Sequence, residues 1–138
     1  MLHTSTGSAM RTTLISVFAI AVFLAVAFML LPKGFSGDTS IIGQGSNVAV
    51  LAHNKDSVQS LNLMEYMNQV RNDYAGKVEF VVADANTPQG RAFIQSQQVE
   101  LGTLLLFASN GTRLQVVNNI DGQSKLRSVL DTAFNKGG

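Results

Sequence analysis

The chain has 138 residues, 46% of them hydrophobic, and its ten basic and nine acidic residues leave a formal net charge of +1. This length allows one compact domain and an appendage, and so sparse a charge lacks the basic surface on which nucleic-acid binding depends. The chain contains no cysteine, which excludes disulfides, thiolate metal sites and cysteine nucleophiles. Its two histidines, His3 and His53, lie in different segments. We therefore predict no metal site, no cofactor and no nucleic-acid partner.

The first predicted element is a long apolar helix. No charged residue occurs between Arg11 and Lys33, and Leu14 to Leu31 is almost entirely apolar. About 18 to 20 helical residues, at about 1.5 Å of rise each, nearly match a hydrocarbon core of roughly 30 Å. We therefore expect the lipid bilayer to contact Leu14 to Leu31, within a transmembrane helix at residues 13–32 that follows an N-terminal tail at residues 1–12.

The same segment favours an uncleaved anchor over a signal peptide. Signal peptides have an apolar stretch of about 7 to 15 residues and a small-x-small cleavage site, whereas this stretch is longer and ends in Leu31-Pro32-Lys33 without Ala-x-Ala. The positive-inside rule compares the basic groups on the two sides of the helix. Arg11 and the amino terminus lie on one side and Lys33 on the other, so the rule places the N-terminus in the cytoplasm. We therefore expect a single-pass protein with an extracytoplasmic domain, which in a bacterium means an inner (cytoplasmic) membrane protein with a periplasmic domain.

Strands and helices alternate in the rest of the chain, after residues 33–46, whose glycine and serine predict a flexible tether. Short apolar runs predict strands, and the helical spacing of Leu63, Met67 and Val70 predicts an amphipathic helix. The predicted elements are a strand at Asn47 to Ala52, a helix at about Ser57 to Tyr74, a strand at Val78 to Asp84, a helix at Gln89 to Gln98, strands at Thr103 to Phe107 and Arg113 to Val117, and a helix from near Gln123. This βαβαββα order predicts an α/β fold with a mixed sheet covered on both faces.

Two stretches of sequence are similar to those of a known family. One is Tyr74-Ala75-Gly76-Lys77-Val78, where the first long helix leads into the next strand, and the other is Gly102-Thr103-Leu104-Leu105-Leu106-Phe107 followed by Asn110-Gly111. Over about Val48 to Phe134 the chain resembles the thioredoxin family, without its first strand and helix. The resemblance implies a thioredoxin-like mixed sheet at residues 47–138. This domain follows the one N-terminal transmembrane helix that the apolar segment predicts.

The resemblance also implies a site that has lost its chemistry. Counted back from Tyr74 without gaps, the Cys-x-x-Cys motif of the family falls on Ser57-Val58-Gln59-Ser60. A serine hydroxyl keeps its proton and forms no sulfur–sulfur bond, so thiol exchange is absent. The cis-proline of the family falls on Gly102, where we expect a trans peptide, and its buried acidic residue falls on Leu51. We therefore predict no catalytic residue and a redox-inactive protein.

The same positions have a functional and a structural interpretation. Ser57, Val58, Gln59, Ser60, Gly102 and Thr103 form a candidate partner-binding surface, because the family holds extended peptides there. The structural interpretation, which we favour for the serines, is that Asp56 or Ser57 caps the following helix. A hydrolase built on His53, Asp56 and Ser57 is disfavoured, because no Gly-x-Ser-x-Gly turn and no oxyanion hole can be identified.

The leading hypothesis is a non-catalytic, membrane-tethered interaction module, an accessory subunit or assembly factor of a membrane protein complex. Its partner would be a protein in or near the membrane, where tethering raises the local concentration of both. The alternative is a structural subunit whose transmembrane helix makes the main contacts through small residues such as Ala21 and Ala25. An enzyme with non-thiol chemistry is the least favoured hypothesis.

Overall fold

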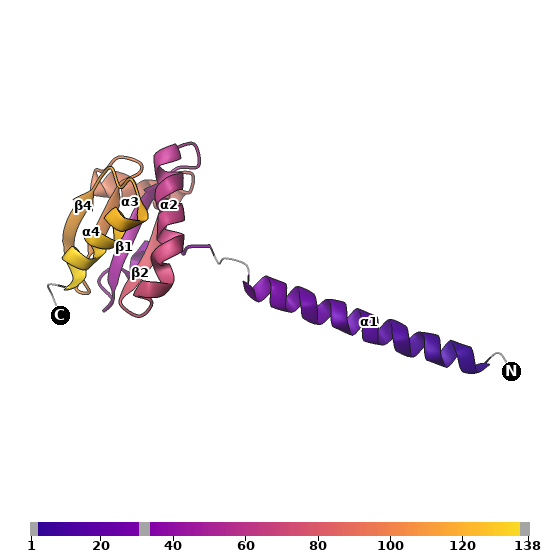
Figure 1. The fold of residues 1–138 in the computed structure, drawn as a ribbon. Coiled ribbons are helices and arrows are strands. Elements are labelled where there is room, and N and C mark those ends of the chain that lie inside the picture. Colours follow the sequence, from indigo (N-terminus) through magenta and orange to yellow (C-terminus); the bar gives the residue numbers. More distant parts are fainter. Residues whose placement is uncertain (1–2, 31–33, 136–138) are drawn as a thin grey trace. The chain divides into compact units, whose positions relative to one another are not determined.

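The computed structural model describes the backbone of residues 3–30 and 34–135, and the side chains of residues 11–26 and 34–135. The chain divides into two compact units, Met1–Lys33 and Gly34–Gly138. Figure 1 draws the first as a helix and the second as a folded domain. We describe each unit by itself.

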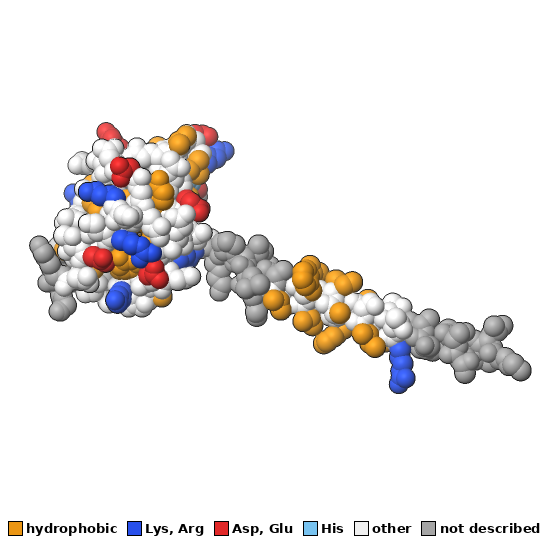
Figure 2. Space-filling model, viewed as in Figure 1, with side chains coloured by type: hydrophobic (Ala, Val, Ile, Leu, Met, Phe, Trp, Pro, Cys, Tyr) orange, Lys and Arg blue, Asp and Glu red, His pale blue; other side chains and the backbone are white. Residues whose placement is uncertain are grey.

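The first unit contains one helix in its described part, α1 at His3–Leu30. Its described side chains, at residues 11–26, are all exposed, and they include large hydrophobic ones such as Phe18 and Phe23. Figure 2 shows hydrophobic side chains along this helix. Within the part of the chain that the structure describes, no helix is both long enough and apolar enough to cross a membrane. The last part of the predicted transmembrane helix, residues 27–32, lies outside the described side chains.

The second unit is built on one four-stranded sheet. Its strands are β1 at Asn47–His53, β2 at Val78–Asp84, β3 at Leu104–Phe107 and β4 at Arg113–Val117, in the spatial order β2-β1-β3-β4. β1 runs parallel to β2, whereas β3 runs antiparallel to both β1 and β4. The predicted mixed sheet is therefore confirmed.

Helices cover both faces of this sheet, as Figure 1 shows. The helix α2 at Val58–Val70, its 3-10 continuation η2 at Arg71–Tyr74 and the helix α4 at Gln123–Asn135 pack on one face, and the helix α3 at Pro88–Gln97 packs on the other. β1 is buried on both faces because successive side chains of a strand point to opposite sides. Ala49 and Leu51 lie in the core under α2 and α4, whereas Val48 and Val50 lie in the core under α3.

The segment predicted as a flexible tether packs on the domain instead. Ser36 forms a parallel bridge with Val81, at the outer edge of β2, and the main-chain N–H of Val82 donates to the Ser36 carbonyl oxygen at 2.9 Å. The short 3-10 helix η1 at Thr39–Ile41 follows, and Ile41 and Ile42 contact the core under α3. The compact unit therefore begins at Gly34 rather than at residue 47, because apolar side chains within the glycine-rich and serine-rich segment are partly buried against the domain.

The helix α3 begins where the sequence places proline at its first position. The Thr87 hydroxyl accepts a hydrogen bond from the main-chain N–H of Gly90 at 3.1 Å and caps the helix, and Pro88 has a backbone suited to a first turn. Gly90 is buried against the end of β2, where an added Cβ would lie 2.0 Å from the Asp84 carbonyl oxygen. Only glycine allows so close an approach of α3 to the sheet.

Candidate functional site

The predicted site lies where the carboxyl end of β1 leads into α2. The Ser57 hydroxyl accepts a hydrogen bond from the main-chain N–H of Ser60 at 3.3 Å, and Ser57 has the extended backbone of an N-cap residue. Upstream, the main-chain N–H of Asp56 donates to the Asn54 side chain at 2.8 Å. Capping of α2 is therefore confirmed, and Ser57 rather than Asp56 provides it.

Ser60 is fully buried and its hydroxyl joins the loop to the strand. This Oγ donates to the Asn54 carbonyl oxygen at 2.8 Å and accepts from the Asn54 N–H at 3.2 Å. It also lies 3.0 Å from Nδ1 of His53 and 3.1 Å from the Ser57 carbonyl oxygen. The prediction that Ser60 belongs to a partner-binding surface is therefore wrong, because its side chain is 0% exposed and its bonding capacity is used inside the domain.

His53 is the last residue of β1 and is also buried, with 7% of its surface exposed. Burial lowers the pKa of His53 below its ordinary value, and attraction to the Asp84 carboxylate opposes that effect. Asp84 is the partner of His53 in the parallel register of β1 and β2. The ring is therefore neutral at physiological pH and supports the loop above it.

Gly102 and Thr103 lie beside this loop but face inward. The Gly102 N–H donates to the Ala52 carbonyl oxygen at 2.8 Å, and the Ala52 N–H donates to the Thr103 carbonyl oxygen at 3.0 Å. Gly102 has a φ of +83°, a left-handed conformation that suits glycine, and an added Cβ would lie 3.0 Å from the Gln59 side chain. The described residues contain no cis peptide bond, so the bond before Gly102 is trans. Both residues are buried, which corrects their assignment to an accessible surface.

The comparisons with known proteins address the fold. No protein-family model matches the sequence, and no curated protein matches it. Among solved structures, thioredoxin O2 from Arabidopsis thaliana in the oxidized state aligns with a TM-score of 0.58 at 15% identity, over 69% of this chain and 84% of that one. An uncharacterized thioredoxin-like protein from Clostridium perfringens aligns with a TM-score of 0.57 at 10% identity, over 65% of this chain and 72% of that one. The folded domain has a thioredoxin-like fold.

A third structure, described as that of a malarial protein, agrees with this fold. It aligns with a TM-score of 0.56 at 13% identity and covers 64% of this chain and 97% of that one. Because all three identities are low, the likeness establishes the architecture of the thioredoxin-like domain and leaves its site to be judged from its own residues.

Three accessible side chains at this site are apolar, beside the exposed Gln59. Val58 is 70% exposed at the first turn of α2, Leu61 is 44% exposed one turn later, and Leu101 is 38% exposed beside Gly102. Figure 2 shows hydrophobic side chains around the upper end of α2, at this end of the thioredoxin-like domain. We call Val58, Leu61 and Leu101 the apolar surface. Sequence reasoning selected Val58 but missed the two leucines, although Leu61 could have been found because it falls outside the buried helical stripe.

The residues of the disfavoured hydrolase do not assemble into a catalytic triad. The histidine contacts Ser60 rather than Ser57, whose hydroxyl caps α2. Ser60, His53 and Asp84 do lie near one another, but the serine is fully buried and its Oγ bonds to Asn54. A substrate carbonyl could not reach that oxygen, so this constellation supports the fold and provides no nucleophile.

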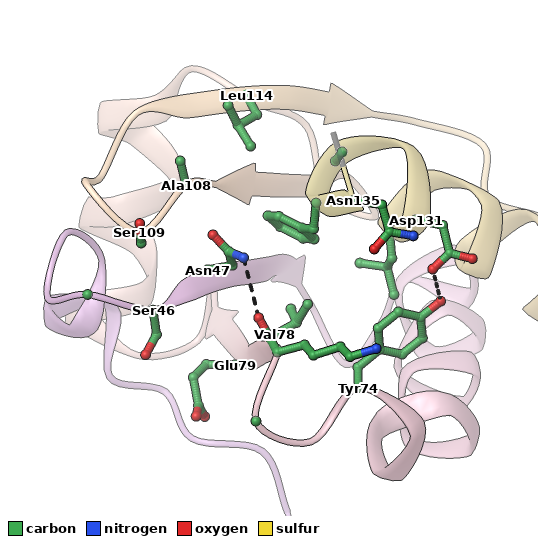
Figure 3. A pocket seen from close by; sticks show the side chains of 16 residues that line it. Ser46, Asn47, Tyr74, Val78, Glu79, Ala108, Ser109, Leu114, Asp131 and Asn135 are labelled. Carbon is green, nitrogen blue, oxygen red and sulfur yellow. Dashed lines mark hydrogen bonds between the residues drawn. The ribbon is translucent and has the colours of Figure 1, made fainter. Parts of the chain in front are cut away.

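An open cavity of about 730 Å³ lies away from this site, at the amino ends of β1 and β2. Figure 3 shows Asn47 between Leu114 and Val78, with Glu79 on one rim and Asp131 on another. Its polar groups are partly engaged already, because the Asn47 amide donates to the Lys77 carbonyl oxygen at 3.4 Å.

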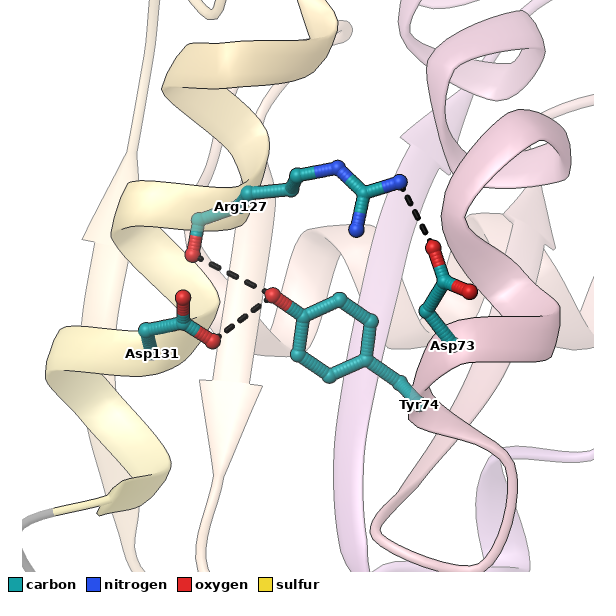
Figure 4. A network of polar contacts seen from close by, with 4 residues as sticks. All are labelled: Asp73, Tyr74, Arg127 and Asp131. Atoms are coloured by element: carbon teal, nitrogen blue, oxygen red, sulfur yellow. Dashed lines mark hydrogen bonds and ion pairs between the residues drawn. The ribbon is translucent and has the colours of Figure 1, made fainter.

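A polar network joins η2 to α4 at the edge of this cavity (Figure 4). The Tyr74 hydroxyl donates to Asp131 at 2.7 Å, and Arg127 pairs with Asp73 at 2.7 Å. Burial and the hydrogen bond to Asp131 raise the pKa of Tyr74 to about 12. The network joins two elements of the domain and so has a structural role.

Proposed function

We propose that the protein is a non-catalytic, membrane-tethered interaction module that serves as an accessory subunit or assembly factor of a membrane protein complex. The observation that carries this proposal is the apolar surface, Val58, Leu61 and Leu101. It lies at the site where the resemblance to the thioredoxin family aligns the two cysteines of that family with Ser57 and Ser60. Exposed apolar side chains that gather at one end of a small domain are a typical mark of an interaction site.

Contacts around Gly102 support binding through side chains rather than through main-chain pairing. The Gly102 N–H and the Thr103 carbonyl oxygen already bond to Ala52, and the Gln59 side chain lies over Gly102. An extended peptide therefore finds few free main-chain groups there. The partner that fits is one that offers an apolar patch to Val58, Leu61 and Leu101.

The membrane part of the proposal rests on the sequence. Leu14 to Leu31 contains no charged residue, and its length suits a bilayer span. The proposed orientation places the N-terminus in the cytoplasm and the thioredoxin-like domain outside, in the periplasm of a bacterial cell. Retention near the membrane would raise the effective concentration of a membrane partner, so that a small contact area could suffice.

Site-specific photo-crosslinking in intact cells tests this proposal. A photoreactive amino acid replaces Val58 in one version of the full chain and Val116 in another. Val116 is the matched control because it is a 41% exposed valine on the edge strand β4. We expect one discrete crosslinked membrane protein from position 58 and none from position 116, and we expect Leu61→Asp to abolish the crosslink from position 58.

Three outcomes would contradict the proposal in different ways. Equal crosslinking from both positions would show that the apolar surface is not a specific site. Loss of the partner on deletion of residues 1–33, with Leu61→Asp having no effect, would favour the structural subunit that binds through its helix. Turnover of any substrate that Ser57→Ala abolishes would overturn the non-catalytic assignment.

A further inference from the structure

A buried histidine supports the loop that carries the apolar surface. His53 lies at the end of β1 and contacts the Ser60 hydroxyl at 3.0 Å. The same hydroxyl bonds to the N–H and the carbonyl oxygen of Asn54. The Ser60 oxygen, in contact with the imidazole, therefore helps to fix the loop at residues 54–57, together with the hydrogen bonds that Asp56 and Ser57 donate to Asn54.

The hydrogen-bond partners of Ser60 favour one tautomer of the neutral ring. The single hydroxyl proton of Ser60 goes to its shortest acceptor, the Asn54 carbonyl oxygen at 2.8 Å. Because the Asn54 N–H donates to this oxygen, the remaining contact is satisfied when Nδ1 of His53 donates to it. An added proton then binds at Nε2 and creates an imidazolium in a buried position.

The charged groups around His53 compensate that cation only in part. From β2, Asp84 attracts it. From α2, residues 58–64 contain no charged side chain, and the strand β3 contains none either. The loop itself contributes Lys55 and Asp56, which are both exposed and of opposite charge. The imidazolium would therefore exchange water for one carboxylate, the Ser60 hydroxyl and otherwise uncharged surroundings.

We propose that His53 makes the loop at residues 54–57 and the first turn of α2 a proton-sensitive element, closed over the neutral ring at neutral pH and opened at acidic pH so that water reaches the imidazolium. Burial lowers the pKa of His53 in the closed state, whereas the open state has a hydrated histidine with an ordinary pKa. The open state therefore binds the proton more tightly, and acid increases its population. The increase is at most about tenfold per pH unit for one proton.

Amide hydrogen exchange on the full chain in mild detergent tests this proposal. Protection factors, corrected for intrinsic exchange, are measured by mass spectrometry between about pH 7.5 and about pH 5, the range around the ordinary histidine pKa. We expect the protection of residues 54–61 to fall by up to about tenfold per pH unit, while that of α3 changes little. The measurement needs no partner, so its result is independent of the proposed function.

Three variants complete the test. His53→Gln removes the titrating group and is expected to make the protection of residues 54–61 independent of pH. His3→Gln changes the other histidine of the chain and is expected to leave the pH dependence intact. Asp84→Asn keeps a side-chain oxygen that can accept the hydrogen bond from the Asn86 N–H, which lies 2.8 Å from Asp84 Oδ1. It removes the carboxylate that stabilises the imidazolium in the closed state, so the acid-induced loss of protection is expected to become larger and to continue to lower pH.

Two results would overturn the proposal. One is protection of the loop that does not depend on pH in the natural protein. The other is pH dependence that persists in His53→Gln. If that variant does not fold, an acid-induced loss of protection that Asp84→Asn leaves no larger overturns the proposal instead, because the attraction to His53 would then have no effect on the loop.

Discussion

Phe35 is the residue whose removal best tests whether residues 34–46 belong to the domain. Its ring packs edge-on against Phe80 with centroids 6.4 Å apart, and the Arg71 guanidinium lies 4.2 Å from its centroid. An aromatic pair contributes about 0.5–1.5 kcal/mol and an exposed cation–π contact about 0.5–1 kcal/mol. Because Phe35 is only partly buried, its own burial adds about 1 kcal/mol. We therefore expect Phe35→Ala to lower the free energy of unfolding by about 2–3 kcal/mol.

Urea unfolding of the fragment 34–138, followed by circular dichroism, measures this loss. Phe35→Leu is the matched control, because it keeps apolar burial but loses the ring contacts, and we expect it to lose about half as much. A fragment that begins at Thr39 should be destabilised further, since it also lacks the Ser36 carbonyl oxygen that bonds to Val82. A surface substitution usually changes the unfolding free energy by less than about 0.5 kcal/mol. If Phe35→Ala changes it by no more than that, residues 34–46 are a flexible tether as the sequence predicted.

Three further predictions concern the interior of the domain. Gly90→Ala forces a Cβ against a carbonyl oxygen of β2 and should lower the unfolding free energy by about 3 kcal/mol or more. Gly37→Ala is the control, because its added Cβ meets only an ordinary contact. It should change the unfolding free energy by less than about 0.5 kcal/mol. Ser60→Ala should cost about 1–3 kcal/mol, because it leaves buried polar partners unpaired, and a loss no larger than that of Gly37→Ala would show that these bonds are not formed. In Tyr66→Phe, the tyrosinate absorbance of Tyr74 should develop only near pH 12, since burial raises its pKa to about 12, and a midpoint near 10 would refute the hydrogen bond to Asp131.

The sequence was sufficient for the regular elements, because their periodicity is local. The stripe of Leu63, Met67 and Val70 predicted α2, and these three side chains are buried in the structure. β1 was recognised as a short valine-rich run, and it is buried on both faces. Periodicity did not show that α2 changes to a 3-10 helix after Val70, since the apolar spacing continues to Tyr74.

Residues 34–46 were misjudged because their contacts are not periodic. Phe35, Ile41 and Ile42 are isolated apolar residues among glycines and serines, and nothing local in the sequence shows that they pack against strands and helices far along the chain. A close approach between Gly43 and Gly111, where an added Cβ on Gly111 would lie 3.2 Å from the Gly43 Cα, joins this segment to the β3–β4 turn. Composition alone predicts a flexible linker there, whereas tertiary contacts determine the outcome.

The site differed from expectation because residue type does not specify the direction of a side chain. A serine three positions after the helix cap faces the core, and Ser60 is therefore buried while its neighbours Gln59 and Leu61 are exposed. The resemblance to the thioredoxin family placed these residues at one site, and their proximity is confirmed by the contact of Gln59 with Gly102. Which of them a partner could touch required the structure.

Gln59 gives the proposed interaction a sharp test, because it covers Gly102 without bonding to it in any described contact. If partners bound through main-chain pairing at Gly102, Gln59→Ala would uncover that loop and strengthen binding. If they bind through the apolar surface, Gln59→Ala should leave the yield of crosslink from Val58 within about twofold, while Leu61→Asp abolishes it, since a charge cannot be buried at an apolar contact without a large loss of affinity. A several-fold increase in crosslink yield in Gln59→Ala would therefore show that the partner binds at the Gly102 loop rather than at the apolar surface. The same substitution separates the two modes, because removal of the Gln59 side chain strengthens binding only in the first of them.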